Sequence, residues 1–269
     1  MMERKKIYTV FPEGKYKALT LSYDDGREED KRLISIFRKY GLKATFNLNS
    51  GLADTDLRRI GKNEWPELYA GFEIAAHTVT HPTISRCPLS FVAEEILKDR
   101  EELEKVTGYP VRGLAYPNGS YTEDIVRMLP PLGISYARVV GNTDNFDIPE
   151  DFLRWKATCH HNHNLLENAD AFISFSKSQY LKLMYVWGHS YEFSQYDNWG
   201  LIEEFASRIS GRNEIWYATN IEIVDYLNAS RNLIFTADLS IVYNPSALDL
   251  WITVDDAPVK IPGGATVKL

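Results

Sequence analysis

The chain has 269 residues, of which 44% are hydrophobic and 25% are charged, as in an ordinary globular protein with one large domain. Its formal net charge is -7, and it has no run or stripe of Lys and Arg. This argues against a nucleic-acid partner, because phosphates require clustered cationic side chains.

No segment is long and apolar enough to predict a membrane span, and Met1 to Thr20 lacks the apolar core of a signal peptide. The cysteines, Cys87 and Cys159, are interpreted as free thiols, which weakly favours a reducing compartment. We therefore expect a cytoplasmic protein, although a secreted protein whose leader had been removed would have the same sequence. Aromatic residues make up 13% of the chain, which fits sugar stacking and ordinary core packing equally well.

In chain order, apolar β-rich segments alternate with segments of helical periodicity. Strands are predicted over residues 18–23, 43–49, 71–76, 112–116, 134–140, 181–187 and 214–218. Helices are predicted over residues 27–40, 56–60, 65–69, 90–107, 121–129, 165–178, 200–209 and 221–228. A strand followed by a helix, repeated about seven times, predicts a distorted (β/α) barrel with a parallel sheet, closed or nearly closed.

Two parts of the chain do not follow this alternation. Residues 141–163 are polar and aromatic, and no element is predicted there. Residues 231–269 contain short β-like runs separated by turns, without any helical pattern. We therefore expect a barrel over residues 1–230 and a small antiparallel β appendage over residues 231–269, with no catalytic residue in the appendage.

Two adjacent carboxylates, Asp24 and Asp25, end the first barrel strand and are followed by Gly26. A buried carboxylate without a partner is costly, and adjacent acids repel each other. The pair therefore predicts a nearby cation. The alternative is a turn without a ligand.

Two imidazoles, His77 and His81, follow the strand over 71–76 and lie four residues apart. At this spacing both rings can bind one ion, and a site of one carboxylate and two imidazoles leaves positions for water and substrate. In (β/α) barrels the active site lies at the C-terminal ends of the strands. The polar residues of interest all follow strands: Asp24, Asp25, His77, Asn118 and His189.

Four motifs together resemble those of the polysaccharide deacetylases, which form carbohydrate esterase family four and are also called NodB-homology proteins. They are Ser22-Tyr-Asp-Asp-Gly26, His77-Thr-Val-Thr-His81, Tyr116-Pro-Asn-Gly119 and Trp187-Gly-His189. The resemblance spans residues 18–228. It implies a distorted (β/α) barrel, one divalent metal ion and hydrolysis of acetyl groups from an N-acetyl sugar or acetylated xylan. The metal is most often Zn²⁺, with Co²⁺, Ni²⁺, Mn²⁺ or Fe²⁺ as alternatives.

Matching positions imply roles for individual residues. The resemblance assigns metal binding to Asp25, His77 and His81. It makes Asp24 the general base and His189 the general acid. The resemblance assigns substrate binding or oxyanion stabilisation to the motif residues Tyr116, Asn118 and Trp187. A backbone N–H of the turn at Asn118 would be the oxyanion donor.

The sequence departs from the family pattern in two places. Many members carry an Arg that pairs with the base, and here the matching position is Ala115. Arg138 on the next predicted strand could supply this charge, or it could be a structural Arg. The Asp that orients the acid histidine also lacks a clear counterpart, for which the candidates are Asp144, Asp147, His160 and His161.

Three functional hypotheses follow. The first is a metal-dependent hydrolase that removes acetyl groups from an acetylated carbohydrate, which would be its partner. The second is hydrolysis of a non-sugar, cyclic amide on the same barrel. The third is a non-catalytic carbohydrate-binding relative. No membrane partner is expected, and the sequence leaves the oligomeric state open.

Overall fold

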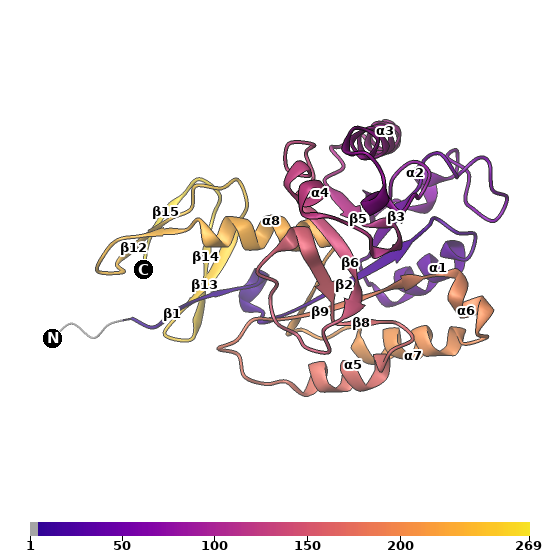
Figure 1. Cartoon of the computed structure of the whole chain (residues 1–269). Helices are drawn as coiled ribbons and strands as arrows, with labels where there is room; N and C mark the ends of the chain where they lie inside the picture. Colours follow the sequence, from indigo (N-terminus) through magenta and orange to yellow (C-terminus); the bar gives the residue numbers. More distant parts are fainter. Residues whose placement is uncertain (1–4) are drawn as a thin grey trace.

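A computed structural model describes residues 5–269 (Figure 1), so the N-terminal segment discussed above lies partly outside the described residues. Its main feature is a parallel sheet of nine strands. These strands are β2 (Lys17–Asp24), β3 (Thr45–Leu48), β4 (Glu73–Ala76), β5 (Gly113–Ala115), β6 (Tyr136–Asn142), β7 (Trp155–Ala157), β8 (Cys159–His160), β9 (Lys182–His189) and β10 (Ile215–Tyr217). The order is β7-β6-β5-β4-β3-β2-β9-β8, with β10 also paired to β2.

The sheet closes through the consecutive strands β7 and β8. β7 pairs with β6 at one end of the sheet and β8 pairs with β9 at the other, and between them Thr158 N donates to Tyr185 O at 2.8 Å. The predicted (β/α) barrel is therefore confirmed, and its irregular seam explains the distortion. The two strands that make the seam were missed because three and two residues are too few to give a β pattern.

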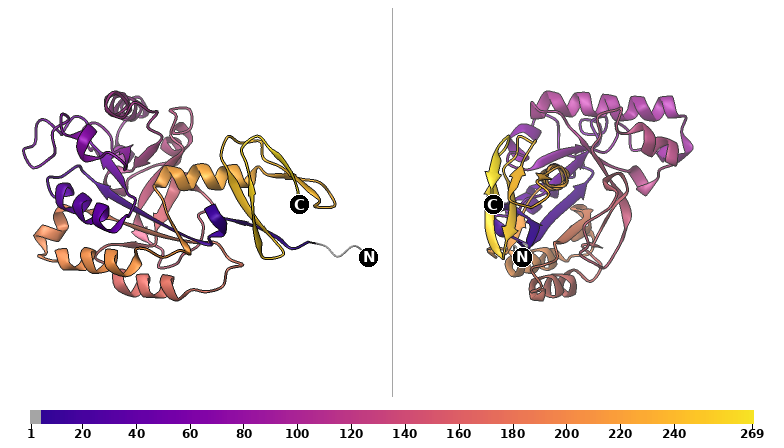
Figure 2. Two further views of the ribbon diagram at one scale, coloured as in Figure 1. Left: turned by 180° about the vertical axis from the view of Figure 1, so that it is seen from behind. Right: turned by 90° about the vertical axis from the view of Figure 1, so that its left-hand side faces the viewer.

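Helices cover the outside of the barrel (Figures 1 and 2). They are α1 (Asp30–Tyr40), α2 (Trp65–Leu68), α3 (Leu89–Thr107), α4 (Glu123–Met128), α5 (Leu165–Ser174), α6 (Tyr191–Gln195), α7 (Trp199–Ile209) and α8 (Asn220–Arg231). The helix predicted over residues 56–60 is wrong. This segment forms turns tied to the acid pair, because Ile60 N donates to Gly26 O at 2.9 Å. The short helix α6 was not predicted.

Alternation along β2 separates two environments. Leu19, Leu21 and Tyr23 are buried in the core between the sheet and the helices. Thr20 and Asp24 point into the barrel, where Thr20 Oγ1 donates to Asn220 Oδ1 at 2.7 Å. The barrel interior is therefore lined by polar side chains that need partners, and Asp24 lies at its C-terminal end.

The N-terminal end of the barrel is plugged by the first residues of α8. The buried carboxylate of Glu73 accepts hydrogen bonds from Thr45 Oγ1 at 2.8 Å, Tyr136 Oη at 2.7 Å and Ile221 N at 2.9 Å. One acid thus connects three strands to the start of a helix, where an acceptor is favoured.

Replacing Glu73 by Ala is expected to lower the free energy of unfolding by about 2–4 kcal/mol, because three buried donors lose their acceptor. Urea unfolding followed by circular dichroism would measure this. The matched control is Glu203→Ala, whose carboxylate is an exposed surface partner of Lys39, and it should cause no measurable change. Equal stability of the two variants would contradict the role given to Glu73.

The predicted C-terminal appendage is confirmed as two small antiparallel sheets beside α8 (Figures 1 and 2). They are formed by β1 (Ile7–Val10), β11 (Ile234–Phe235), β12 (Ile241–Tyr243), β13 (Leu250–Val254), β14 (Ala257–Ile261) and β15 (Thr266–Lys268). One sheet has the order β1-β13-β14 and the other β11-β12-β15. The N-terminal strand β1 therefore joins the C-terminal segment, a pairing that local sequence could not reveal.

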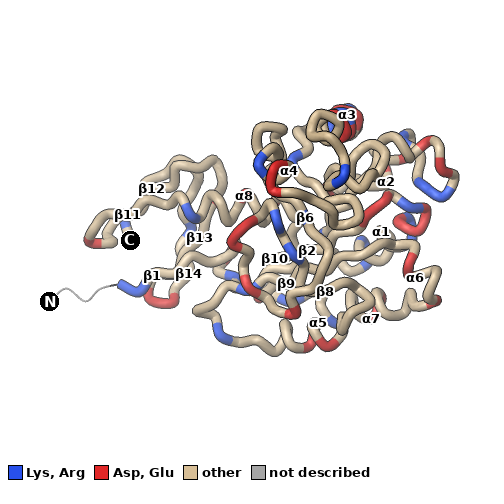
Figure 3. Tube along the Cα trace, in the orientation of Figure 1, with Lys and Arg blue, Asp and Glu red and all other residues tan. Residues whose placement is uncertain are grey.

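Figure 3 shows acidic and basic residues mixed along the elements, with both signs together on α3. Within residues 5–269, no helix is long and apolar enough to cross a membrane.

Candidate active site

The acid pair lies in a tight left-handed turn at the end of β2. Asp25 has a φ of 82° and Gly26 a φ of 61°. A Cβ atom on Gly26 would lie 2.9 Å from Leu48 Cδ2, so both conformation and space favour glycine there. This turn directs the two carboxylates differently: Asp24 is buried in the barrel and Asp25 is partly exposed beside it.

His77, at the end of β4, faces both acids. Its Nδ1 donates to the carbonyl oxygen of Ala115 at 2.8 Å, since a carbonyl can only accept. The lone pair of Nε2 is therefore free, and Nε2 lies 3.9 Å from Asp24 Oδ2 and 4.0 Å from Asp25 Oδ1. A ring fixed by its remote nitrogen in this way is typical of a metal ligand.

His81 completes a group of three ligand atoms. Its Nε2 lies 4.0 Å from Asp25 Oδ1, and the ligand atoms of Asp25, His77 and His81 all lie within 4.8 Å of one another. Bonds of about 2.0–2.2 Å to a central ion place such ligand atoms about 3–4 Å apart. The donor set therefore suits a first-row divalent ion, and the ligand atoms lie at or slightly beyond the spacing that such an ion gives its ligands.

Two residues that the sequence did not reveal support these ligands. Asp99 on α3 is fully buried and accepts hydrogen bonds from the backbone N–H groups of Ser50 at 2.7 Å and His77 at 2.9 Å. Arg59 donates to the backbone oxygen of Asp25, and its guanidinium lies 3.4 Å from Asp25 Oδ1. Both fix the backbone of a predicted ligand. Both residues lie outside the motifs, so no local pattern indicated a role for them.

Asp24 is bound by two donors inside the barrel. Arg138 Nη2 donates to Oδ2, and Asn47 Nδ2 donates to Oδ1 at 2.8 Å. Burial alone would raise the pKa of Asp24, but Arg138, the nearby imidazoles and Asn47 outweigh it and hold the pKa at about 2. Asp24 is therefore ionised near neutral pH.

Arg138 occupies the place left open by Ala115. The two residues are direct partners in the register between β5 and β6, so the guanidinium reaches the interior from the next strand. Arg138 is buried and its guanidinium carbon lies 4.4 Å from the ring centroid of Trp187. Arg112, the residue directly before β5, pairs with Asp225 on α8.

His189 lies opposite the ligand group at the end of β9. Its Nε2 is 3.9 Å from Asp24 Oδ2, and its Nδ1 is 3.4 Å from Glu192 Oε1. Burial lowers the pKa of His189, but Glu192 and Asp24 outweigh this effect and raise it. Glu192, three residues further on in α6, was missed, although the spacing within His189-Ser-Tyr-Glu192 was a usable signal.

The acids considered from sequence as partners of His189 contact other residues. Asp144 pairs with His163 at 2.9 Å, and Asp147 pairs with Lys182 at 2.7 Å. These predictions are wrong, because the loop containing both acids covers the seam rather than the catalytic end of the barrel. The other two candidates, His160 and His161, lie against Glu192.

The other residues predicted to bind substrate or stabilise the oxyanion do not all lie beside the acids and histidines. Trp187 lies beside Arg138 and His189, with its ring centroid 5.9 Å from that of His189. Tyr116 is buried, stacks on Tyr121 and donates to Leu153 O at 2.8 Å, and its role in substrate binding stays a prediction. Asn118 has a φ of 56°, and its side chain donates to Thr83 Oγ1 at 3.2 Å.

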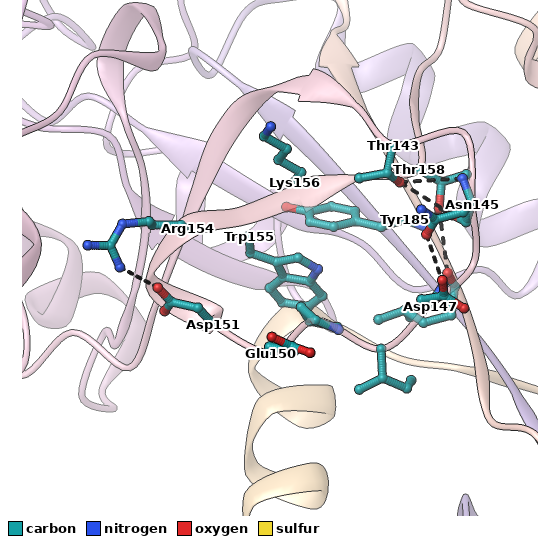
Figure 4. A pocket seen from close by; sticks show the side chains of 13 residues that line it. Thr143, Asn145, Asp147, Glu150, Asp151, Arg154, Trp155, Lys156, Thr158 and Tyr185 are labelled. Atoms are coloured by element: carbon teal, nitrogen blue, oxygen red, sulfur yellow. Dashed lines mark hydrogen bonds and ion pairs between the residues drawn. The ribbon is translucent and has the colours of Figure 1, made fainter.

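A cavity of about 230 Å³ lies elsewhere, at the seam (Figure 4). Trp155 and Tyr185 form its aromatic part, and the loop over residues 143–151 supplies most of its polar lining. None of its lining residues belongs to the acid and imidazole group. The cavity is therefore separate from the candidate active site.

Comparisons with known proteins relate this chain to a family and to solved structures. The family model described as polysaccharide deacetylase matches residues 12–137. This match confirms the predicted family over the part of the chain that carries the first three motifs. A curated relative, the uncharacterized protein YlxY of Bacillus subtilis strain 168, is 24% identical over 128 residues. The match covers 46% of this chain and only 38% of that protein.

Solved structures share the fold. A putative polysaccharide deacetylase from Mycobacterium smegmatis is 16% identical, with a TM-score of 0.60 over 82% of this chain and 93% of that one. A family 4 carbohydrate esterase from Streptomyces lividans, in complex with acetate, is 16% identical, with a TM-score of 0.50 over 76% and 93%. A family pseudoenzyme from Bacillus anthracis is 18% identical, with a TM-score of 0.51 over 81% and 68%. At these identities the likeness establishes the fold alone.

Proposed function

We propose that this protein is a metal-dependent hydrolase that removes acetyl groups from an acetylated carbohydrate. The observation that carries the proposal is the arrangement around Asp24. This buried, ionised carboxylate lies beside the ligand group of Asp25, His77 and His81, and His189 faces it from the other side. The match of residues 12–137 to the polysaccharide deacetylase model supports deacetylation of a carbohydrate as the reaction.

The side chains divide the proton transfers between them. A divalent ion held by Asp25, His77 and His81 would supply Lewis-acid chemistry to the acetyl carbonyl and lower the pKa of a water molecule. Asp24 accepts the proton of the attacking water, and Arg138 and Asn47 hold it in place.

The leaving nitrogen or oxygen then takes a proton from Nε2 of His189. The Glu192 carboxylate stabilises this ring in its protonated form. An acid and a base that face each other across the same space, with pKa values held apart, can complete hydrolysis of the acetyl group.

The proposal is tested by acetate release from chitooligosaccharides, peptidoglycan fragments and acetylxylan, with and without a chelator. Release that the chelator abolishes and added metal restores is the expected result. Absence of metal-dependent release from all three would count against the proposal. Turnover of a ring amide alone would favour the cyclic-amide hypothesis, and sugar binding without turnover would favour a non-catalytic relative.

Replacing Arg138 by Gln is expected to move the acid limb of the pH–rate profile to higher pH by about 1 unit or more, because the guanidinium lowers the pKa of Asp24. A carboxylate with a depressed pKa stays ionised until the pH falls through that value, so losing Arg138 narrows the active range from the acid side. The profile of kcat/KM for acetate release measures this shift.

Two further variants complete this test. Arg138→Lys keeps the charge and should shift the limb less, whereas Arg112→Gln removes an arginine that pairs outside the site and should leave it unchanged. If the acid limb of the pH–rate profile did not move in a folded Arg138→Gln protein, the proposed effect of Arg138 on Asp24 would be contradicted.

A further inference from the structure

One carboxylate, that of Glu192, is shared by three imidazoles. Glu192 Oε2 lies 3.0 Å from Nε2 of His160 and 3.0 Å from Nε2 of His161, and Oε1 lies 3.4 Å from Nδ1 of His189. His161 is fully buried, and the other members of this group are mostly buried. Such a cluster needs a physical reason, since buried polar groups without partners are costly.

A second metal ion is one explanation, because His160, His161 and Glu192 present ligand atoms within 4.8 Å of one another. The hydrogen bonds of His160 argue against it. Its Nδ1 accepts from the backbone N–H of Asn162 at 3.1 Å, so the proton of the neutral ring is on Nε2. A neutral imidazole that binds a metal through Nε2 carries its proton on Nδ1 instead. His160 therefore offers Glu192 an N–H group and no free lone pair.

Within residues 5–269, the carboxylate of Glu192 is the ion-pair partner of His161. Nε2 of His161 lies 3.0 Å from Glu192 Oε2, but neither ring nitrogen of His161 nor Glu192 Oε2 has a hydrogen-bond partner among the described residues. The ring is stacked between Tyr23, at 5.7 Å and 15°, and Phe193, at 4.1 Å and 25°. Packing thus fixes the plane of the His161 ring. In this plane Nε2 of His161 faces the carboxylate of Glu192.

The glycine of the fourth motif makes room for this ring. A Cβ atom on Gly188 would lie 2.1 Å from Nδ1 of His161, which is too close for any side chain to fit. The strand that carries His189 is therefore shaped around His161. This contact links the acid histidine to a residue from the polar segment in which no element was predicted.

A single negative charge can balance one imidazolium only. His160 turns an N–H toward Glu192, because its Nδ1 accepts from the backbone of Asn162. Burial lowers the pKa of His161 to about 4, so that ring is neutral near neutral pH. The charged and titratable groups around His189 are Asp24 and Asp25 beyond β2, Glu192 and Tyr191 from α6, and His160 from β8.

We propose that His160 and His161 are positioning residues, which hold the Glu192 carboxylate against His189 and share its charge with that ring. The inference rests on the proposed function insofar as His189 is the acid. It assigns a role to two histidines outside the motifs, and it makes the protonation of His189 depend on how many N–H groups neutralise Glu192.

The proposal predicts that two substitutions shift the pKa of His189 in opposite directions. Glu192→Gln should lower the apparent pKa of His189 by about 1 unit, because the carboxylate is lost. His161→Leu should raise it by about half a unit, because Glu192 keeps its charge and loses a donor. His161→Gln retains an N–H group at the position of Nε2 and should restore the wild-type value.

The measurement is an NMR titration of the ring signals in the full-length, zinc-loaded protein, which has only six histidines to assign. The alkaline limb of the pH–rate profile should move in the same directions. Because the NMR titration needs no substrate, it distinguishes failure of this inference from failure of the proposed function. If His161→Leu does not fold, His160→Phe, at a partly exposed position, tests the same loss of a donor.

A pKa of His189 that stays unchanged in folded His161→Leu or His160→Phe protein would overturn the proposal. So would a shift in the same direction as that of Glu192→Gln. Elemental analysis provides a third arm, in which wild-type protein should bind one zinc ion per chain. A second ion that His161→Leu removes would show that the cluster is a metal site instead.

Discussion

Replacing Asp24 by Asn is expected to lower kcat/KM for acetate release by about 10²–10⁴-fold while the metal stays bound. The variant keeps the acceptor oxygen that faces Asn47, but it removes the charge that accepts a proton from water. It also leaves the buried Arg138 guanidinium without its anion, so some loss of stability is expected as well.

Kinetic assays, metal analysis and thermal unfolding of the same preparation separate these effects. Asp147→Asn is the matched control, since this acid pairs with Lys182 outside the site and its loss should leave turnover unchanged. Full activity of Asp24→Asn would exclude the proposed base. Loss of metal with the same substitution would mean that Asp24 is a ligand.

Replacing His81 by Ala is expected to weaken metal binding by more than about 100-fold and to abolish turnover at low metal concentration. Even residues that only support a ligand typically contribute 10–100-fold. His81 presents its Nε2 to the Asp25 carboxylate from the less buried side of the group. Excess metal should partly restore the activity, which it cannot do for Asp24→Asn.

Metal stoichiometry after dialysis and titration of the apoprotein with Zn²⁺, Co²⁺, Ni²⁺ and Mn²⁺ provide the measurement. The matched control is His163→Ala, an exposed histidine that pairs with Asp144 and should not affect metal content. A His81→Ala protein that retained its metal, beside an Asp24→Asn protein that lost it, would reverse the roles assigned to the two residues.

Much of the fold could be predicted from local pattern. The seven predicted strands correspond to strands of the barrel, because each is an apolar run long enough to show β character. β7 and β8 were missed because they are held by pairing with β6 and β9 and not by their own composition. The turn over residues 56–60 was predicted as a helix because a short apolar period cannot indicate the tertiary contact that opposes it.

Some residues of the candidate site could likewise be predicted from local sequence, and others could not. Asp24, Asp25, His77, His81 and His189 could be predicted because each follows a strand in a short motif. Arg138 was also named from sequence as a possible partner of the base, and it contacts Asp24. Asp99 on α3 could not be predicted, because it reaches His77 only through the tertiary fold. Glu192 was missed, although its spacing from His189 was a usable signal.

The candidate donor residues of this protein can therefore be recognised from short stretches of sequence. They are an acid pair after one strand and an imidazole pair after another. The sequence alone determined these donors and the parallel barrel that orders them. Only the tertiary structure decided the protonation states, since burial and charged neighbours from other strands hold Asp24 ionised and favour protonation of His189. The physical reason is that donor type is a property of one residue, whereas a pKa is set by every charge and surface that the fold brings around it.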